Sequence, residues 1–156
     1  MHLEIFGSGG YASVRDTRRA LRSIRDRVRF WGHQRNVVAA YKSIDFLLSG
    51  LPEKEALGLN IIEAQACSTP VLAPAAAPFD ETVAHETTGL LYRDPREDGG
   101  AGFEAALKRV LEGGFRFDAE LARVHLARFS EEAFAERVRG LAQTLENLGA
   151  EKTAAS

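Results

Sequence analysis

The stretch that decides the fold reads LPEKEALGLNIIEAQACSTPVL, from Leu51 to Leu72. It predicts a loop that opens at Pro52, a helix over about 60–67, a Ser-Thr-Pro stop and a buried strand that begins at Val71. A glycine at such a loop-to-helix junction leaves backbone N–H groups pointing outward. These groups suit a phosphate, so the stretch is a candidate ligand site.

Two carboxylates in this stretch, Glu55 and Glu63, stand eight residues apart, one before the predicted helix and one within it. A carboxylate beside a crevice can accept hydrogen bonds from both hydroxyl groups of a vicinal diol. The same two residues also fit an ordinary loop charge and a solvated helix face. The chemistry of these residues alone leaves both interpretations open.

Length and composition fit one domain with its own core. The chain has 156 residues, of which 45% are apolar and 27% charged, as in soluble globular proteins. A net charge of −2 argues against a nucleic-acid binder. The single cysteine, Cys67, fits a reducing compartment, and no apolar run approaches the roughly 18 residues of a membrane span. We therefore expect a cytoplasmic protein.

Short strands and helices alternate along the chain. Strands are expected at about 2–6, 27–31, 44–48, 71–73 and 88–92, and helices at about 13–27, 36–42, 60–67, 103–111 and 118–128. This order predicts an α/β fold, a three-layer Rossmann-like parallel sheet with helices on both faces. The loops at the carboxyl ends of the strands then share one rim, where ligands bind. The domain is expected over 1–150.

The C-terminal part has its own pattern. Residues 93–102 are polar and predict a surface loop. Ser130 is the expected N-cap of a last helix, with acidic residues in its first turn. Its apolar stripe consists of Phe134, Val138, Leu141, Leu145 and Leu148. Residues 151–156 form a polar tail that we expect to be frayed.

The order of motifs resembles a known family. The Leu57-Gly58-Leu59 step lies between Glu55 and Glu63, and EAQACSTPV follows over 63–71. This combination resembles the C-terminal, donor-binding half of the retaining GT-B glycosyltransferases of family 4, also called group 1. The resemblance covers roughly residues 3–145. It implies the C-terminal half of a GT-B fold and, when completed, retaining glycosyl transfer from a nucleotide-diphosphate sugar, a UDP- or GDP-sugar.

The resemblance also implies roles for particular residues. Glu55 would bind sugar hydroxyls as the catalytic-site carboxylate, and Glu63 would bind the ribose hydroxyls. The remaining donor-binding residues lie in three loops: Gly7 and Gly9, His33 and Gln34, and Leu57, Gly58 and Leu59. His33 and Gln34 would lie near the base, and the other two groups near the sugar or phosphates. No Asp-x-Asp pair and no metal-ligand spacing of histidines occur, so no metal cofactor is indicated.

One part of the family pattern is missing. In the family the domain opens with a strand followed by an arginine and a lysine that hold the diphosphate, and nothing before His2 matches them. By the usual strand order this strand is central, so a gap or an exposed edge is expected in the sheet. We therefore expect a fragment of a two-domain enzyme, or a chain completed by an acceptor-domain chain or another copy.

Arginines are concentrated near the N-terminus. Residues 1–43 hold nine basic residues against three acidic ones, and the arginines of the predicted 13–27 helix lie opposite its apolar stripe. This pattern fits a solvated helix face. It also fits a surface that meets anionic lipid at the inner membrane face, or an acidic partner.

Two other functions compete with donor binding. The first is a non-catalytic module that retains the fold and binds a partner through the arginine helix and an open sheet edge. The second is a different nucleotide-binding α/β protein with hydrolase or epimerase activity, which the lack of a His/Asp/Cys constellation disfavours.

Overall fold

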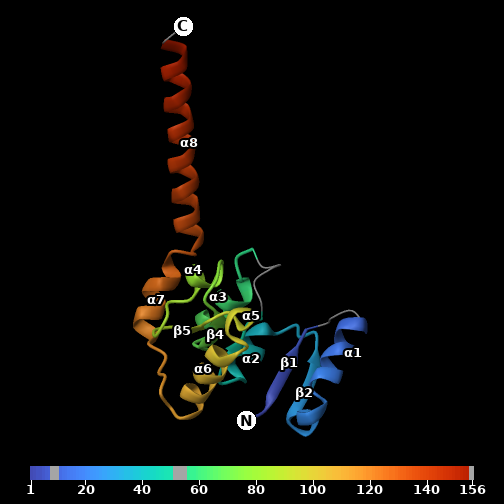
Figure 1. The fold of residues 1–156 in the computed structure, drawn as a ribbon. Coiled ribbons are helices and arrows are strands. Elements are labelled where there is room, and N and C mark those ends of the chain that lie inside the picture. Colours follow the sequence, from blue (N-terminus) through green and yellow to red (C-terminus); the bar gives the residue numbers. More distant parts are fainter. Residues whose placement is uncertain (8–10, 51–55, 155–156) are drawn as a thin grey trace.

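The computed structural model describes residues 1–7, 11–50 and 56–154, and it contains two parallel sheets (Figure 1). In the first sheet β1 (Leu3–Phe6) pairs with β2 (Val28–Gly32). The second has the order β3 (Leu47–Leu48), β4 (Val71–Pro74) and β5 (Gly89–Tyr92). Every strand pair is parallel, which confirms the α/β class predicted from the alternation of elements.

Helices connect these strands and follow them. They are α1 (Tyr11–Ala20), the 3-10 helix η1 (Arg22–Arg27), α2 (Val37–Lys42), α3 (Leu59–Ala66), α4 (Phe79–Thr82), α5 (Pro95–Asp98), α6 (Ala101–Leu111), α7 (Ala119–Ala127) and α8 (Glu131–Ala154). The single helix predicted over 13–27 is wrong in its second half. The chain tightens there into η1, where Ile24 has non-helical backbone angles (φ −120°, ψ 17°).

The polar segment 93–102 is also more ordered than predicted. It contains α5, because Asp94 caps the helix and Pro95 occupies its first position. The Asp94 side chain accepts a hydrogen bond from the backbone N–H of Arg96, and proline is well suited to the first helical turn. Four residues are too few for a periodic signal, so the sequence pattern indicated only a loop.

The core lies on both faces of the three-stranded sheet. Val71 and Ala73 of β4 are fully buried on the face that α3 and α4 cover. Leu72, between them, points to the opposite face and packs with Leu90 and residues of α6. Because successive side chains of a strand alternate between faces, a continuous apolar run is buried only when both faces are covered. This half of the protein has the three predicted layers.

The β1–β2 pair is covered less well. None of its strand residues is fully buried. On one face the Phe30 ring lies under the guanidinium of Arg18 from α1, 4.8 Å from its centroid. On the other face Phe6 and Trp31 stack on each other with ring centroids 6.3 Å apart, and Trp31 is half-exposed.

The strands form two separate sheets, which fits the gap or exposed edge that was expected. Across Figure 1 the labelled strands follow the order β5, β4, β1, β2, and β3 pairs with the edge of β4 opposite β5. In the described part of the chain, no strand pairs with the inner edge of β1 or with the outer edge of β3. The interruption therefore falls between β1 and β3.

Helix α8 extends away from the rest of the molecule (Figure 1). Its predicted N-cap is confirmed, because the Ser130 hydroxyl accepts a hydrogen bond of 3.2 Å from the Ala133 N–H. The apolar stripe from Phe134 to Leu148 is exposed along the helix. The helical backbone continues to Ala154 and so includes the first residues of the expected tail. The 1–150 domain boundary stays a prediction.

Candidate functional site

The junction before α3 has the conformation that the Leu57-Gly58-Leu59 step suggests. Gly58 has left-handed backbone angles (φ 76°, ψ 54°), and as a glycine at the N-cap position it provides no capping side chain of its own. A Cβ at Gly58 would lie 3.3 Å from Ile61 Cδ1 and 3.4 Å from Phe79 Cε1. Conformation and packing therefore both favour glycine. Leu57 and Leu59 on either side are exposed, so the N-terminal end of α3 faces outward, as anion binding requires.

Glu63 lies about one turn into α3 with its side chain held in place. Its Oε2 atom accepts a hydrogen bond of 2.8 Å from the Tyr41 hydroxyl. Glu63 is exposed overall, so its carboxylate keeps acceptor capacity for further donors while one oxygen is anchored. The Glu63 side chain is therefore attached to Tyr41. This geometry fits both a solvated helix face and a carboxylate that binds a diol.

Tyr41 itself is firmly seated on α2. Its ring packs against the core cluster around Ile61, and its backbone carbonyl accepts a hydrogen bond of 2.9 Å from the Thr69 hydroxyl. Burial, and then the hydrogen bond to Glu63, raise the pKa of the Tyr41 phenol above its ordinary value. The phenol therefore stays protonated and acts as the donor at neutral pH.

Tyr41 is not among the site residues predicted from the sequence. A signal was present, since a partly buried tyrosine needs a partner for its hydroxyl. The partner is 22 residues further along the chain, on another helix, and no local pattern reveals such a contact.

Three other predicted residues lie at the end of the β1–β2 pair. Gly7 has a positive φ of 104°, and its N–H donates to the Gly32 carbonyl over 2.8 Å. His33 follows and is exposed. The side-chain amide of Gln34 donates to the Trp31 carbonyl over 2.9 Å, so it stabilises its own turn. The contact of this loop with a base stays a prediction.

The described site residues therefore form two groups. Gly7, His33 and Gln34 lie at the end of the two-stranded sheet, and Leu57, Gly58, Leu59 and Glu63 lie at α3. No hydrogen bond or ion pair between described residues joins the first group to the second. Glu55 and Gly9 lie outside the described residues. Of the predicted carboxylate pair, the structure therefore describes Glu63.

A hollow of about 290 Å³ lies where the three-stranded sheet ends. It is lined by Leu48, Ser49, Gly50, Tyr92, Pro95 and Phe103. Leu48 and Tyr92 are the last residues of β3 and β5, so the hollow opens at the carboxyl ends of parallel strands, where ligands bind in such folds. The Tyr92 hydroxyl donates weakly to the Ser49 carbonyl over 3.4 Å. Burial raises the pKa of the Tyr92 phenol.

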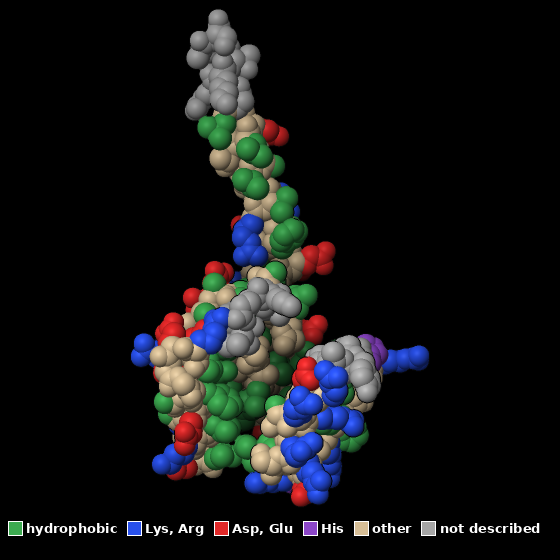
Figure 2. Space-filling view, turned by 45° about the vertical axis from the view of Figure 1, so that its right-hand side comes forward, with side chains coloured by type: hydrophobic (Ala, Val, Ile, Leu, Met, Phe, Trp, Pro, Cys, Tyr) green, Lys and Arg blue, Asp and Glu red, His purple; other side chains and the backbone are tan. Residues whose placement is uncertain are grey.

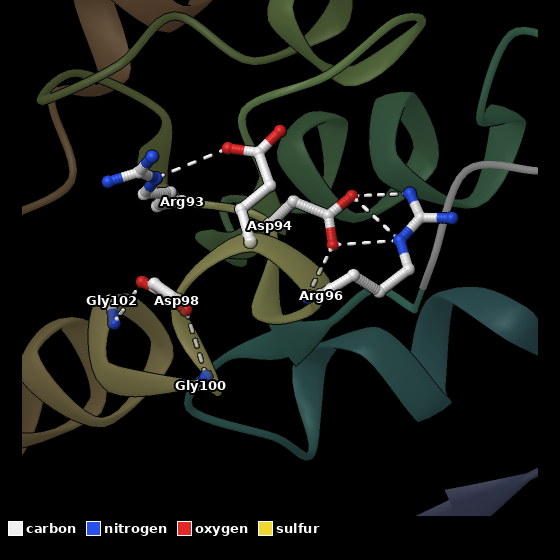
Figure 3. Close-up of polar contacts among 7 residues, drawn as sticks. Arg93, Asp94, Arg96, Asp98, Gly100 and Gly102 are labelled. Atoms are coloured by element: carbon white, nitrogen blue, oxygen red, sulfur yellow. Dashed lines mark hydrogen bonds and ion pairs between the residues drawn. The ribbon is translucent and has the colours of Figure 1, made fainter.

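An aspartate and an arginine are paired beside this hollow (Figure 3). The buried Asp94 carboxylate accepts hydrogen bonds from the Arg96 side chain, with Nε 2.9 Å from Oδ1 and 3.0 Å from Oδ2. These bonds, and the one from the Arg96 backbone, lower the pKa of Asp94 to about 2. Asp98 similarly holds the next turn, accepting from the N–H groups of Gly100 and Gly102, each over 2.8 Å.

Within 1–7, 11–50 and 56–154, no three His, Cys, Asp or Glu side chains lie together in a way that could hold a metal ion. No helix in those ranges is long and apolar enough to cross a bilayer. The expectation that no metal cofactor takes part stays a prediction.

Fold and site together define an α/β protein of the Rossmann-like class, with its candidate ligand-binding groups at helix and strand ends. Residues 1–113 match the family described as "Glycosyl transferases group 1", and the chain belongs to this family. The family predicted from the Glu55–Glu63 stretch is thereby confirmed.

Particular relatives agree with this assignment. The chain is 40% identical over 68 residues to N-acetyl-alpha-D-glucosaminyl L-malate synthase of Bacillus anthracis, a match that covers 44% of this chain and 18% of that protein. Sucrose-phosphate synthase from Thermosynechococcus elongatus superimposes with a TM-score of 0.71 at 28% identity, covering 94% of this chain and 39% of that one. Anabaena HepE in complex with UDP gives a TM-score of 0.71 at 18% identity, with coverage of 94% and 41%.

The chain spans much less than the full length of these relatives. It covers 18% of the curated relative and about two fifths of the two solved structures. The similarity to HepE shows the fold alone, because the identity is low. The pneumococcal O-GlcNAc transferase GtfA, solved with UDP and GlcNAc, also shares the fold, with a TM-score of 0.69 at 16% identity. This match covers 92% of the chain and 29% of GtfA.

Proposed function

We propose that this domain binds the nucleotide-diphosphate sugar of a glycosyltransferase and serves as the donor-binding part of a two-domain enzyme. The observation that carries the proposal is Glu63, an exposed carboxylate anchored by Tyr41 one turn inside the helix that begins after Gly58. Family membership supports it. So do HepE and GtfA, two proteins of the same fold whose structures contain UDP.

The residues divide the donor between them. Glu63 accepts hydrogen bonds from the ribose hydroxyls, because one of its oxygens is free to pair with a diol while Tyr41 holds the other. The outward N–H groups at the start of α3 face the phosphates or the sugar. Glu55, outside the described residues, takes the sugar hydroxyls. Departure of the diphosphate in a retaining transfer is assisted by N–H donors and positive charge around it.

The interrupted sheet supports a larger enzyme. Both edges that face the interruption carry unpaired backbone groups in the described part of the chain, and such edges accept another strand. We propose that a strand from another part of a larger enzyme, or from another chain, fills this place. An acceptor-domain chain supplies it in one version of the proposal, and another copy of this chain in the other. The cytoplasmic location stays a prediction.

Unpaired sheet edges also favour a second candidate function. A domain that retains the fold without the chemistry would use the β1 and β3 edges to bind a partner strand. Such a module needs no donor nucleotide, and this difference makes the two functions separable by experiment.

Isothermal titration calorimetry with UDP, GDP and their sugar conjugates tests the proposal. We expect binding of one nucleotide, with affinity reduced about tenfold or more by Glu63→Ala, because a charged acceptor for two hydroxyls is lost. Glu104→Ala removes another exposed helical carboxylate, on α6, and is expected to leave binding unchanged. Heat from no nucleotide would favour the partner-binding module, and equal weakening by both variants would contradict the role of Glu63.

A further inference from the structure

Charge is divided unevenly between two parts of the molecule. Residues 11–35 contain eight arginines and two acidic residues, whereas the rest of the chain has 12 basic and 20 acidic residues. The net charge of −2 therefore hides a strongly basic segment on an acidic body. An uneven distribution of this kind produces a local field that a small net charge does not reveal.

The eight arginines of residues 11–35 are all exposed, and we call them together the arginine surface. It comprises Arg15, Arg18 and Arg19 of α1, Arg22, Arg25 and Arg27 of η1, Arg29 of β2, and Arg35. Arg15 and Arg19 are four residues apart in α1 and so share one side of this helix. Figure 2 shows basic side chains gathered over the lobe built by α1, η1 and β2, with few acidic side chains among them.

Most of this charge is not neutralised within the described part of the protein. Arg15 pairs with Asp16 over 3.3 Å and Arg25 with Asp26 over 3.6 Å, both as exposed sequence neighbours, which is a weak kind of ion pair. No described carboxylate pairs with Arg19, Arg22, Arg27, Arg29 or Arg35. Like charges held this close repel each other, so the arrangement favours an external anion.

The residue type and the distribution of charge indicate which kind of anion this surface binds. The segment 11–35 contains arginine and no lysine, and a guanidinium pairs with a phosphate through two parallel hydrogen bonds. A bilayer touches only this lobe and leaves the acidic body in solvent. A nucleic acid long enough to pass beyond the lobe would meet that acidic body.

We infer that the arginine surface is a docking site for the anionic face of a lipid bilayer, with arginines contacting lipid phosphates. This docking needs no nucleotide, so a failure of donor binding would not contradict it. It would place the domain at a membrane surface, where lipid-linked acceptors are found.

Co-sedimentation of the full chain with vesicles tests the inference. We expect binding to vesicles of phosphatidylcholine with about one third phosphatidylglycerol, little binding to pure phosphatidylcholine, and a steep loss between 50 and 500 mM NaCl, on the scale set by screening. Arg15→Glu/Arg19→Glu/Arg22→Glu should weaken binding at least tenfold. The control Arg116→Glu/Arg137→Glu/Arg139→Glu changes the net charge equally at exposed positions outside the lobe and should bind normally.

Circular dichroism shows whether each variant is folded, and glutamine at positions 15, 19 and 22 replaces glutamate if the first variant is not. Equal sedimentation with neutral vesicles, or equal losses in both triple variants, would overturn the inference. So would displacement by poly-glutamate or single-stranded DNA at matched charge concentration, because the surface would then prefer an acidic protein or a nucleic acid.

Discussion

The two sheets of this protein contain similar apolar strands and yet differ in how well they are buried. All four residues of β4 are buried between α3 and α4 on one side and α6 on the other. All four residues of β1 are only half-buried, although Leu3, Ile5 and Phe6 are as apolar as a core strand requires. Burial therefore depends here on neighbours, since β4 has a strand on each edge and β1 has one strand among the described residues.

The proposed strand between β1 and β3 would remove this difference in burial between β1 and β4. An apolar strand with a free edge is usually protected by charge, proline or a covering element. The unprotected edge of β1 fits a half that gains its core from another segment. The following predictions compare the two halves, from the largest expected effect to the smallest.

The β1–β2 half should unfold before the β3–β4–β5 half. Trp31 is the only tryptophan in the chain and lies in β2, so its fluorescence reports that half, whereas far-ultraviolet circular dichroism is dominated by helices throughout the chain. We expect the fluorescence transition at a lower urea concentration. Amide protection in β1 and β2 should be about a hundredfold or more below that of β4. Coincident transitions would show one cooperative unit and contradict the comparison.

Truncation of a phenylalanine should matter more in the three-stranded half. Phe79 is 1% exposed in the core under β4, so Phe79→Ala should lower the free energy of unfolding by about 3–5 kcal/mol. Phe30 is half-buried under α1, and Phe30→Ala should cost about 1–2 kcal/mol, because solvent already reaches the ring. Urea denaturation followed by circular dichroism measures both. Equal losses would show that the β1–β2 half has a comparable core.

The same contrast explains what could be predicted from the sequence. The strand at Val71, the helix after Gly58 and the cap at Ser130 follow from local patterns, and the structure contains them. The interruption of the sheet has no local signal and was expected only from the family's strand order.

The contacts of the site were harder to predict than its elements. The Tyr41–Glu63 hydrogen bond joins two helices, and the Asp94–Arg96 pair depends on a four-residue helix. These two contacts depend on tertiary geometry or on a helix cap. Hydrophobic periodicity along the sequence does not indicate either of them. The roles of Gly7, His33 and Gln34 toward a ligand stay predictions.

Replacing a glycine by alanine should also distinguish the β1–β2 half from the three-stranded half. A Cβ at Gly89 would lie 2.2 Å from the Val71 carbonyl oxygen inside the sheet, so Gly89→Ala should cost about 3 kcal/mol. At Gly7 no atom lies within 4 Å of the added Cβ, and only the positive φ of 104° opposes alanine, for about 1–2 kcal/mol. The midpoints of urea denaturation measure both effects. A larger loss at Gly7 would contradict the open surroundings of the β1 end.

Acid should weaken the three-stranded half through Asp94. The pKa of its carboxyl group is lowered to about 2 from an ordinary 3.8, so the stability it contributes is present above about pH 4 and is lost as the pH falls toward 2. Asp94→Asn should therefore flatten the dependence of the urea midpoint on pH between about 4 and 2. Asp26→Asn removes an exposed carboxylate in η1 and should leave that dependence in place.

The smallest effect is expected at α2, which connects the two halves in sequence. Tyr41→Phe removes the hydroxyl that holds Glu63, and the loss should be about 1 kcal/mol, because the Glu63 oxygen can turn to water. Tyr92→Phe is the matched control; its hydrogen bond to Ser49 is long, at 3.4 Å, so we expect a loss below about 0.5 kcal/mol. If donor binding is established, Tyr41→Phe should also weaken it, since an untethered Glu63 must be ordered by the ligand. Unchanged nucleotide affinity in Tyr41→Phe, with Glu63→Ala still impaired, would show that Tyr41 contributes to stability without orienting the carboxylate.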